Sequence, residues 1–262
     1  MPEGHTVHRI ANEFNELFAG KKLRVDSPQG RFTDAAVIDG LVLLNASAVG
    51  KQMFLHFGQD TILRIHLGIY GKWQFHKGAQ PEVIGQVRAR FMAGGVTAEL
   101  RGPTVCEVID SEALAEVYDR LGPDPLNPDP TGAEYQRFAS RVKRSTTPIG
   151  LLLMNQEVIS GIGNVYRAEI LFRARINPHT PGGSLKPKQL KALWADSVML
   201  LEVGVRQGVM ITRDEFLGED PGKAERNWVY KREGQPCRKC RKKIVLEVAA
   251  GRKLYWCPGC QR

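Results

Sequence analysis

The sequence predicts an α+β protein of more than one domain, and three observations support this fold class. A helical apolar pattern at the start is followed by many short β-rich stretches, which is typical of a helix packed on a sandwich or barrel-like sheet. Four prolines in the nine residues 122–130 then interrupt the chain, and the pattern beyond them is helical. Two CxxC pairs near the C-terminus predict a small metal-binding hairpin.

The N-terminal half is predicted to contain one helix and a set of short strands. Apolar residues recur at helical spacing from Thr6 to Phe18, and Gly20 follows them as a stop signal. Short β-rich stretches separated by turn residues come next, and we expect strands at 36–44, 52–57, 61–67, 72–75, 87–92, 96–100 and 104–109.

The proline-rich segment marks the expected domain boundary. It divides the chain into a sheet domain at 1–121, a linker at 122–135, a helical domain at 136–229 and a metal-binding segment at 230–262. Within the helical domain, Thr147 is a candidate N-cap with Pro148 at the first helical position. Further helices are expected at 165–173 and 184–208, separated from the first by a glycine-rich turn.

The charge of the chain is concentrated at its C-terminus. Thirty-seven basic and 28 acidic side chains give a net charge of +9. Residues 231–262 hold ten Lys or Arg against Glu233 and Glu247, and therefore +8 of that total. A basic block of this kind is typical of a surface that binds a polyanion, although a solvated basic face is the alternative.

The sequence also bears on the cellular compartment. No apolar run approaches the roughly 18 to 20 residues that a membrane helix needs. The N-terminus carries Glu3 with no apolar segment behind it, unlike a secretory signal. We therefore expect a cytoplasmic protein, in which five cysteines do not form a disulfide framework.

Four cysteines have the spacing of a zinc site. Cys237 and Cys240 form one CxxC pair, and Cys257 and Cys260 form another after 16 intervening residues. Four thiolates satisfy tetrahedral Zn²⁺, so we expect one structural zinc per chain. The alternatives, buried structural cysteines or two redox pairs, fit poorly with such a polar surrounding sequence. Cys106 is left over and is interpreted as a small buried residue of a strand.

Two further features carry candidate chemistry. The turn Gly161–Asn164 joins two helical segments, and the N-terminus of the second helix offers backbone N–H groups and the Asn164 amide to a phosphate. Removal of Met1 would leave Pro2 as a terminal secondary amine, a nucleophile for a sugar C1′ with Glu3 beside it as general acid or base. Alone, each feature is more often just a turn or an ordinary N-terminus.

Together, these motifs give the chain a family resemblance. Pro2-Glu3-Gly4, the Gly161–Asn164 turn and the final GR-x2-YWCPGCQ make it similar to the formamidopyrimidine-DNA glycosylase / endonuclease VIII family. The resemblance runs over the whole chain. It implies an N-terminal helix and β-sandwich with catalytic residues, then a DNA-binding helix-two-turn-helix domain and a zinc finger with four cysteine ligands. It also implies a bifunctional enzyme that excises oxidised bases and then cuts the strand by β,δ-elimination.

The resemblance also implies roles for individual residues. Pro2 matches the iminium-forming nucleophile, Glu3 the acid/base residue, and Lys51 the strand lysine that reaches the sugar and phosphate of the lesion. Asn164 and Arg252 match residues that hold backbone phosphates. Ile69 and Tyr70 match the side chains that fill the space left by the flipped base. For Ile69, packing in the core is the alternative. The implied partner is damaged DNA, which a monomer binds at the bacterial nucleoid. We expect no association with a membrane and no small-molecule cofactor.

Two departures from the family bear on the substrate. The family often has an acid at position 6, where this chain has Thr6. The branch that acts on purine lesions carries an Asp-Pro-Arg-Arg-Phe-Gly type loop, whereas the comparable stretch 101–107 here has no Arg-Phe pair. We therefore expect the endonuclease VIII branch and oxidised pyrimidines. A purine-lesion glycosylase and a non-catalytic binder of damaged DNA remain the alternatives.

Overall fold

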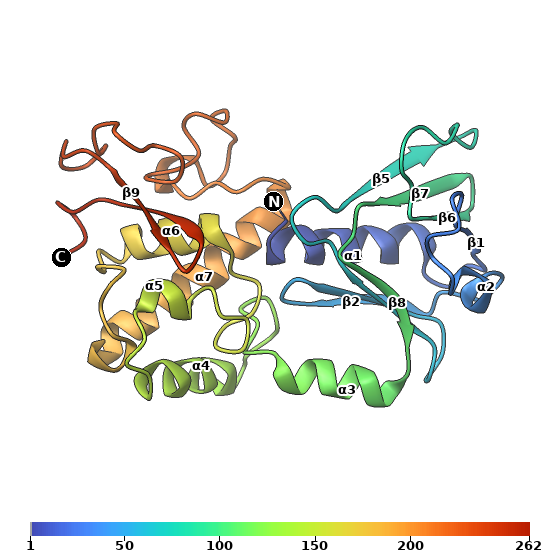
Figure 1. Cartoon of the computed structure of the whole chain (residues 1–262), viewed down its shortest axis with the longest axis horizontal. Helices are drawn as coiled ribbons and strands as arrows, with labels where there is room; N and C mark the ends of the chain where they lie inside the picture. The colour runs from blue at the N-terminus through green and yellow to red at the C-terminus, as the bar shows by residue number, and fades with distance from the viewer. Residues whose placement is uncertain (1) are drawn as a thin grey trace. The chain divides into compact units, whose positions relative to one another are not determined.

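The computed structural model describes residues 2–262, and the chain divides into two compact units, Met1–Arg120 and Leu121–Arg262. Figure 1 shows the first unit in blue to green, with most of its elements labelled. They are α1 (Gly4–Phe18), β1 (Arg24–Asp26), α2 (Ala35–Ile38), β2 (Asn45–Val49), β3 (Gln52–His56), β4 (Ile62–His66), β5 (Lys72–Lys77), β6 (Ala89–Ala93), β7 (Val96–Arg101), β8 (Val105–Ile109) and α3 (Ser111–Arg120).

The first unit contains the helix and the β-sandwich that the sequence predicted, and the helix packs between the two sheets. Both sheets are four-stranded and antiparallel, with strand orders β1-β6-β7-β5 and β2-β3-β4-β8. Phe14 of α1 contacts Trp73 of the first sheet, with ring centroids 4.7 Å apart. On the other side, Asn15 exchanges two hydrogen bonds with the backbone of Ala46 in β2, at 2.8 and 2.6 Å.

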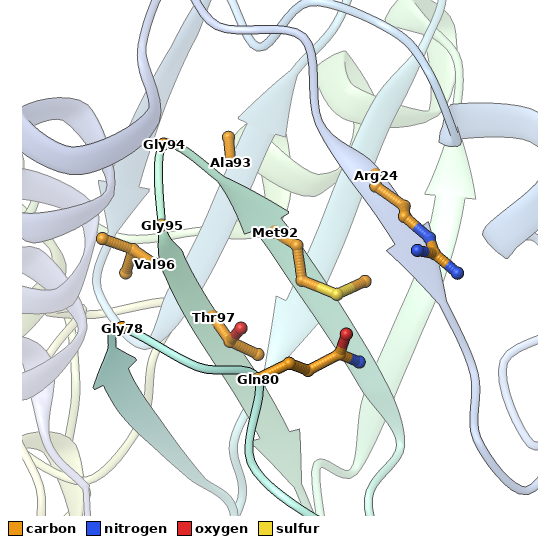
Figure 2. A pocket seen from close by; sticks show the side chains of 9 residues that line it. All are labelled: Arg24, Gly78, Gln80, Met92, Ala93, Gly94, Gly95, Val96 and Thr97. Carbon is orange, nitrogen blue, oxygen red and sulfur yellow. The ribbon is translucent and has the colours of Figure 1, made fainter.

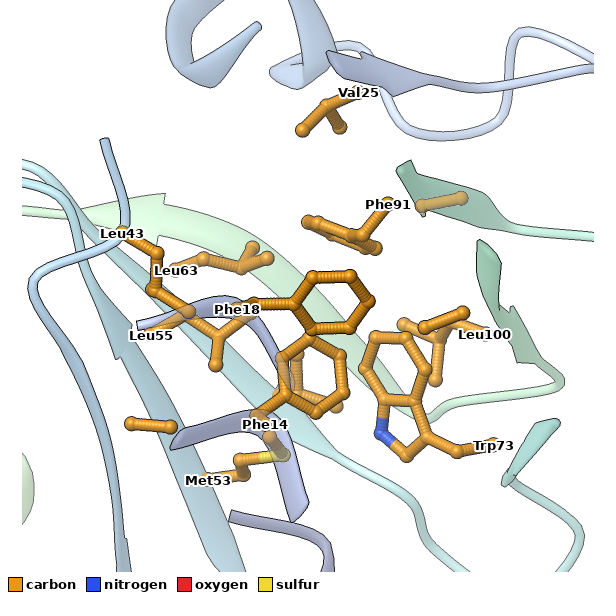
Figure 3. Close-up of a cluster of buried hydrophobic side chains, with 14 of the residues drawn as sticks. Phe14, Phe18, Val25, Leu43, Met53, Leu55, Leu63, Trp73, Phe91 and Leu100 are labelled. Carbon is orange, nitrogen blue, oxygen red and sulfur yellow. The ribbon is translucent and has the colours of Figure 1, made fainter. Parts of the chain in front are cut away.

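The core of this unit explains why α1 forms where it does. The helical positions 7, 10, 11, 14 and 18 are all buried, so one face of α1 is removed from water along its whole length. Figure 3 shows Phe14 and Phe18 of this face among apolar side chains from both sheets, including Leu55, Phe91 and Leu100. This packing fixes the helix that begins two residues after Pro2.

The prediction of a strand at 36–44 was wrong. The structure has the short helix α2 there, followed by a turn at Gly40, whose φ is 78°. Strand β2 begins only at Asn45. An apolar run of this length is compatible with either a strand or a buried helix, because periodicity does not separate them. The sequence patterns also missed β1 and α3.

The second unit is helical and ends in a small hairpin. Its elements are α4 (Ala133–Lys143), α5 (Ile149–Leu152), α6 (Asn164–Arg173), η1 (Gly182–Ser184), α7 (Pro187–Gln207), η2 (Asp214–Phe216), β9 (Val245–Ala249) and β10 (Arg252–Trp256). Helix α7 ends where Gly208 adopts the left-handed conformation, with φ 71°, that favours glycine. The N-cap of α5 is Pro148 rather than Thr147.

The proline-rich segment packs on the second unit. Gly122 donates a backbone hydrogen bond to Gln156 at 2.7 Å, and Pro123 accepts one from Ser160 at 2.9 Å. A Cβ on Gly122 would lie 2.6 Å from the carbonyl oxygen of Glu157, so only glycine fits at this contact. Helix α4 then begins at Ala133, inside the range 122–135 that we expected as a linker. Among residues 2–262, no helix is both long enough and apolar enough to cross a membrane.

Candidate active site and zinc finger

The residues at the start of the chain lie at the N-terminus of α1. Glu3 is the N-cap residue, with extended backbone, and its carbonyl accepts a hydrogen bond from the backbone N–H of Thr6 at 2.9 Å. The side chain of Glu3 is buried, whereas Pro2 is partly exposed. The fold therefore keeps the ring of Pro2 accessible beside a carboxyl group that is withdrawn from water.

Pro2 lies in the wall of a hollow of about 350 Å³ within the first unit. The other lining residues come from α1, from the segment that joins β4 to β5 and from the start of β5: Thr6, Arg9, Ile10, Leu67, Ile69, Gly71, Lys72 and Trp73. A volume of this size is within the range of small-molecule sites. Sequence analysis missed Arg9, although its spacing from Thr6 and Ile10 places the three residues on one face of α1.

Lys51 is held at one end of the β2–β3 pair of the second sheet. It lies in the turn between β2 and β3 and is partly buried. The next residue, Gln52, is the register partner of His66, whose pKa is lowered by burial and by the charge of Lys51. His66 ends β4, and the next residue, Leu67, lines the hollow with Pro2. The catalytic role of Lys51 remains a prediction.

Ile69 and Tyr70 occupy the tip of the turn between β4 and β5. They are 59% and 86% exposed, so core packing, the alternative for Ile69, does not occur in this structure. Two glycines bracket the tip. A Cβ on Gly68 would lie 1.9 Å from the hydroxyl of Thr104, and a Cβ on Gly71 would lie 2.2 Å from the carbonyl oxygen of Leu67.

The turn between β7 and β8 lies against this tip. The backbone N–H of Thr104 donates to the carbonyl of His66 at 2.8 Å, and a Cβ on Gly102 would be 3.6 Å from the carbonyl oxygen of Tyr70. The stretch 101–107, which lacks the Arg-Phe pair, is therefore next to the candidate wedge residues.

Another titratable group lies beside the N-terminus. His5 is buried, and its Nε2 is 3.1 Å from the hydroxyl of Thr6. Burial lowers the pKa of His5 to about 3, with a further contribution from Arg9. The imidazole is therefore neutral at physiological pH. Sequence analysis did not assign it a role, since a single histidine on a helix face carries no distinctive pattern.

A second hollow of about 250 Å³ lies over β6 and β7 (Figure 2). The turn glycines Gly94 and Gly95 form one end of it, and among the described residues that line it only Arg24 from β1 is ionisable. None of these described lining residues belongs to the predicted active site.

The four cysteines of the predicted zinc site are brought together. Their Sγ atoms all lie within 4.8 Å of one another, with Cys237 and Cys260 3.8 Å apart and Cys240 and Cys257 3.4 Å apart. Tetrahedral zinc with Zn–S bonds of about 2.3 Å places its sulfurs about 3.8 Å apart. The donor set and the spacing therefore fit one structural zinc. With four protein ligands, such an ion has no open position for a reacting water.

Asn164 and the zinc-finger hairpin are in contact. Asn164 begins α6 and is 8% exposed, and its side-chain amide donates to the backbone carbonyl of Lys253 at 2.8 Å. The buried Arg167 donates to the same carbonyl at 3.0 Å. Arg252, the preceding residue, begins β10 and is exposed. Two of the predicted phosphate-binding residues are thus held in one part of the fold.

Glu169 ties the same helix to the start of the zinc finger. Its buried carboxylate accepts hydrogen bonds from the backbone N–H groups of Trp228, Val229 and Tyr230 at 2.7 to 2.9 Å. It also accepts one from the hydroxyl of Thr212 at 2.6 Å. Charge-assisted bonds of this kind are the strong ones in proteins. Sequence analysis missed this role, because the partners are about 60 residues away in the chain.

Comparison with known proteins agrees with this architecture. Residues 1–103 match the formamidopyrimidine-DNA glycosylase N-terminal domain, residues 121–215 match its H2TH domain, and residues 234–262 match the zinc finger found in FPG and IleRS. Endonuclease 8 1 of Mycobacterium tuberculosis is 45% identical over 274 residues, which cover 100% of both chains.

Solved structures share the fold. The MutM (Fpg) protein of Thermus thermophilus superposes with a TM-score of 0.79 at 29% identity, over 99% of this chain and 98% of that one. Lactococcus lactis Fpg (MutM), in a complex with DNA containing N7-benzyl-Fapy-dG, gives a TM-score of 0.84 at 22% identity over 100% of both chains. The chain belongs to the formamidopyrimidine-DNA glycosylase / endonuclease VIII family, whose members are bifunctional base-excision-repair DNA glycosylases and abasic-site lyases.

Proposed function

We propose that this DNA glycosylase and abasic-site lyase uses the secondary amine of Pro2 as its nucleophile and removes oxidised pyrimidines. The observation that carries the proposal is the position of Pro2 in the wall of the hollow, with the buried Glu3 next to it in the chain. An α-amine has a pKa of about 7.7 to 8.0, so an appreciable fraction is unprotonated at neutral pH.

The reaction follows from these two groups. The target base leaves the helical stack, and the nitrogen of Pro2 attacks C1′ of its sugar. The bond from C1′ to the base breaks, and Glu3 supplies the proton that the departing base takes up. The Pro2 nitrogen then loses its proton, the bond from C1′ to O4′ breaks as O4′ takes up a proton, and a covalent iminium remains. Removal of a 2′ proton then breaks the bond to the 3′ phosphate, and a second elimination breaks the bond to the 5′ phosphate.

Other residues position the DNA in this proposal. Lys51 reaches the sugar and phosphate of the lesion, while Asn164 and Arg252 hold backbone phosphates through donated hydrogen bonds. Ile69 and Tyr70 enter the space that the base has left, and their exposure at the tip of a turn supports this role. The zinc is structural, and no step of the reaction passes through it.

Two observations support pyrimidine lesions. The turn at 101–107 lies beside the wedge residues and lacks the Arg-Phe pair that a purine-lesion enzyme uses on the opposite strand. The relative at 45% identity carries the name Endonuclease 8 1, whereas the relatives named formamidopyrimidine-DNA glycosylase that match all of this chain are 29% to 30% identical. We propose further that the enzyme acts as a monomer on damaged DNA in the cytoplasm.

Borohydride trapping tests the role of Pro2. Reduction of the iminium should give a stable protein–DNA adduct on an oligonucleotide with one abasic site, and an N-terminal extension that blocks the amine should abolish it. Glu3→Gln should excise a damaged base far more slowly. An equally strong adduct from the blocked protein would assign the nucleophile to another residue. The absence of any adduct from the processed wild-type chain would favour a non-catalytic binder.

A further inference from the structure

Arg167 is a fully buried arginine of α6, in a place where a charged side chain requires bonded partners. Its Nη1 atom donates to the carbonyl of Gly150 in α5 at 3.3 Å. Its Nη2 atom donates to the Oδ1 atom of Asn164 and, at 3.0 Å, to the carbonyl of Lys253 in β10. One side chain therefore connects α5, the first residue of α6 and the zinc-finger hairpin.

This guanidinium determines which way the amide of Asn164 faces. An asparagine amide has an oxygen that accepts and an NH2 group that donates, whereas a guanidinium only donates. The oxygen therefore faces Arg167. One N–H of the NH2 group reaches the carbonyl of Lys253 at 2.8 Å. A flipped amide would place its NH2 group against the donors of Arg167 and its oxygen against a carbonyl oxygen, so this orientation is the only favourable one.

The carbonyl of Lys253 completes the arrangement. It accepts from both Asn164 and Arg167, and a carbonyl oxygen has two lone pairs with which to do so. Hydrogen bonds in a buried network of this kind are electrostatically stronger than in water. Because Lys253 follows the exposed Arg252, the same bonds hold the start of β10 against the first residue of α6.

We propose that Arg167 is a positioning residue, which holds the amide of Asn164 in the orientation that donates to a DNA phosphate. The amide has a second N–H group besides the one that reaches Lys253, and Asn164 stands at a helix N-terminus, which favours an anion. A flipped amide would present an oxygen to the phosphate and repel it. Arg167 is buried and acts through Asn164. The inference therefore rests on the proposed phosphate contact of Asn164, and it names the residue that orients this contact.

Arg167→Met tests this role, because methionine is long and unbranched but has no donor. The measurement is the affinity for a duplex with one tetrahydrofuran analogue of an abasic site, in which the phosphates near the site are replaced one at a time by a neutral methylphosphonate. Each replacement that weakens binding by the wild-type chain marks a contacted phosphate. Asn164→Ala should become insensitive to one of these replacements, which identifies the phosphate that Asn164 holds.

Arg167→Met should lose its sensitivity at the same phosphate. In wild type, replacement of that phosphate should weaken binding by about 10-fold, the effect of one hydrogen bond to a charged group. In Arg167→Met the loss should be less than about 3-fold, while the replacements at other phosphates should act as they do in wild type. Arg167→Lys keeps a donor for the Oδ1 atom of Asn164 and should restore part of the sensitivity. A merely structural role would not single out one phosphate.

Arg173→Met is the matched control. Arg173 also lies on α6 and is also held by several bonds, to Asp196 at 3.0 Å, to Asp214 at 2.7 Å and to the carbonyl of Thr212 at 2.8 Å. Its loss removes an arginine with as many partners from the same helix, but none of these partners is Asn164. The dependence of binding on each phosphate should therefore stay that of wild type.

The outcomes separate this inference from the function on which it rests. Wild-type sensitivity at every phosphate in Arg167→Met, with an altered pattern in Asn164→Ala, would overturn the role of Arg167 and leave the contact of Asn164 in place. A wild-type pattern in Asn164→Ala would refute that contact and this inference with it. If Arg167→Met is poorly folded, the comparison is made between Arg167→Lys and Arg173→Lys, and sensitivity at the phosphate of Asn164 should fall only in the first.

Discussion

The side-chain amide of Asn164 donates a 2.8 Å hydrogen bond to the backbone carbonyl of Lys253. This bond joins the first residue of α6 to the second residue of β10, next to Arg252. Asn164 is therefore part of the contact between α6 and the hairpin, whereas the side chain of Arg252 is exposed to solvent. The two proposed phosphate ligands should respond differently to substitution.

Arg252→Ala should weaken binding to abasic DNA without altering stability, while Asn164→Ala should lower both. Loss of one phosphate contact reduces the slope of log Kd against log salt by about 0.9. Loss of the buried amide should lower the free energy of unfolding by about 1 to 2 kcal/mol. Urea unfolding and salt-dependent binding measure the two effects. An unaltered salt slope in Arg252→Ala would place this residue outside the DNA interface.

Glu169→Gln should destabilise the second unit strongly. The amide nitrogen of glutamine would face backbone N–H groups that now donate hydrogen bonds to the carboxylate. The hydrogen bonds that remained would no longer be charge-assisted. We expect the free energy of unfolding to fall by about 2 to 4 kcal/mol, measured by urea denaturation. Glu202→Gln, on the exposed face of α7, is the control and should have almost no effect. Equal stability of the two variants would show that the bonds of Glu169 contribute little.

Cys257→Ser should lower the zinc content and loosen the C-terminal hairpin. A structural zinc contributes folding free energy directly, so loss of one thiolate ligand weakens both metal binding and the local fold. Metal analysis should find about one zinc per wild-type chain and much less in the variant. Cys106→Ser should keep its zinc, because this residue lies in β8 and burial raises the pKa of its thiol to about 12. Full DNA affinity in a metal-free protein would contradict the structural role.

His5 should make stability depend on pH below neutrality. Its folded pKa is about 3, mainly because of burial, and lies below the ordinary value of 6.5. Between these values the unfolded chain binds a proton that the folded chain does not, so stability falls as the pH drops from 6.5 towards 4. The slope attributable to His5 approaches about 1.4 kcal/mol per pH unit. His5→Gln should remove it, and an identical pH profile for both proteins would exclude this assignment.

The preferred lesion should be an oxidised pyrimidine. We expect faster single-turnover excision of thymine glycol and dihydrouracil than of 8-oxoguanine opposite cytosine, with weak dependence on the opposite base. The reason is that the turn at 101–107 has no Arg-Phe pair with which to hold an orphaned cytosine. The comparison requires matched duplexes that differ only in the lesion. If 8-oxoguanine opposite cytosine were the best substrate, the assignment to the endonuclease VIII branch would be wrong. The proposed roles of Pro2 and Glu3 would be unaffected.

Much of the fold could be predicted from local patterns. The spacing of four cysteines was enough to predict the metal site, because two CxxC pairs supply the four thiolate ligands of a tetrahedral structural zinc. The apolar period of α1 and the short strands from β3 onwards were likewise visible. Periodicity did not distinguish α2 from a strand at 36–44, where a turn at Gly40 ends a single helical turn.

The parts of the site that sequence could not provide depend on long-range contacts. Glu169 lies within a motif, yet its function as a ligand for three backbone N–H groups depends on residues 228–230. Arg9 becomes notable only because the segment after β4 folds against α1 and forms a hollow with it. The hydrogen bond between Asn164 and Lys253 likewise could not be predicted from local patterns, because the two residues are 89 positions apart in the chain.

The glycine bracket around Ile69 and Tyr70 has a consequence for how such enzymes diversify. Gly68 and Gly71 admit no side chain, so the path of the backbone through this turn is fixed. The two positions between them are largely exposed to solvent. Natural variation or directed evolution can therefore exchange these two residues freely at almost no cost in folding, whereas substitution of either glycine alters the frame. A saturation library at positions 69 and 70 would sample new base-stack fillers on an unaltered scaffold.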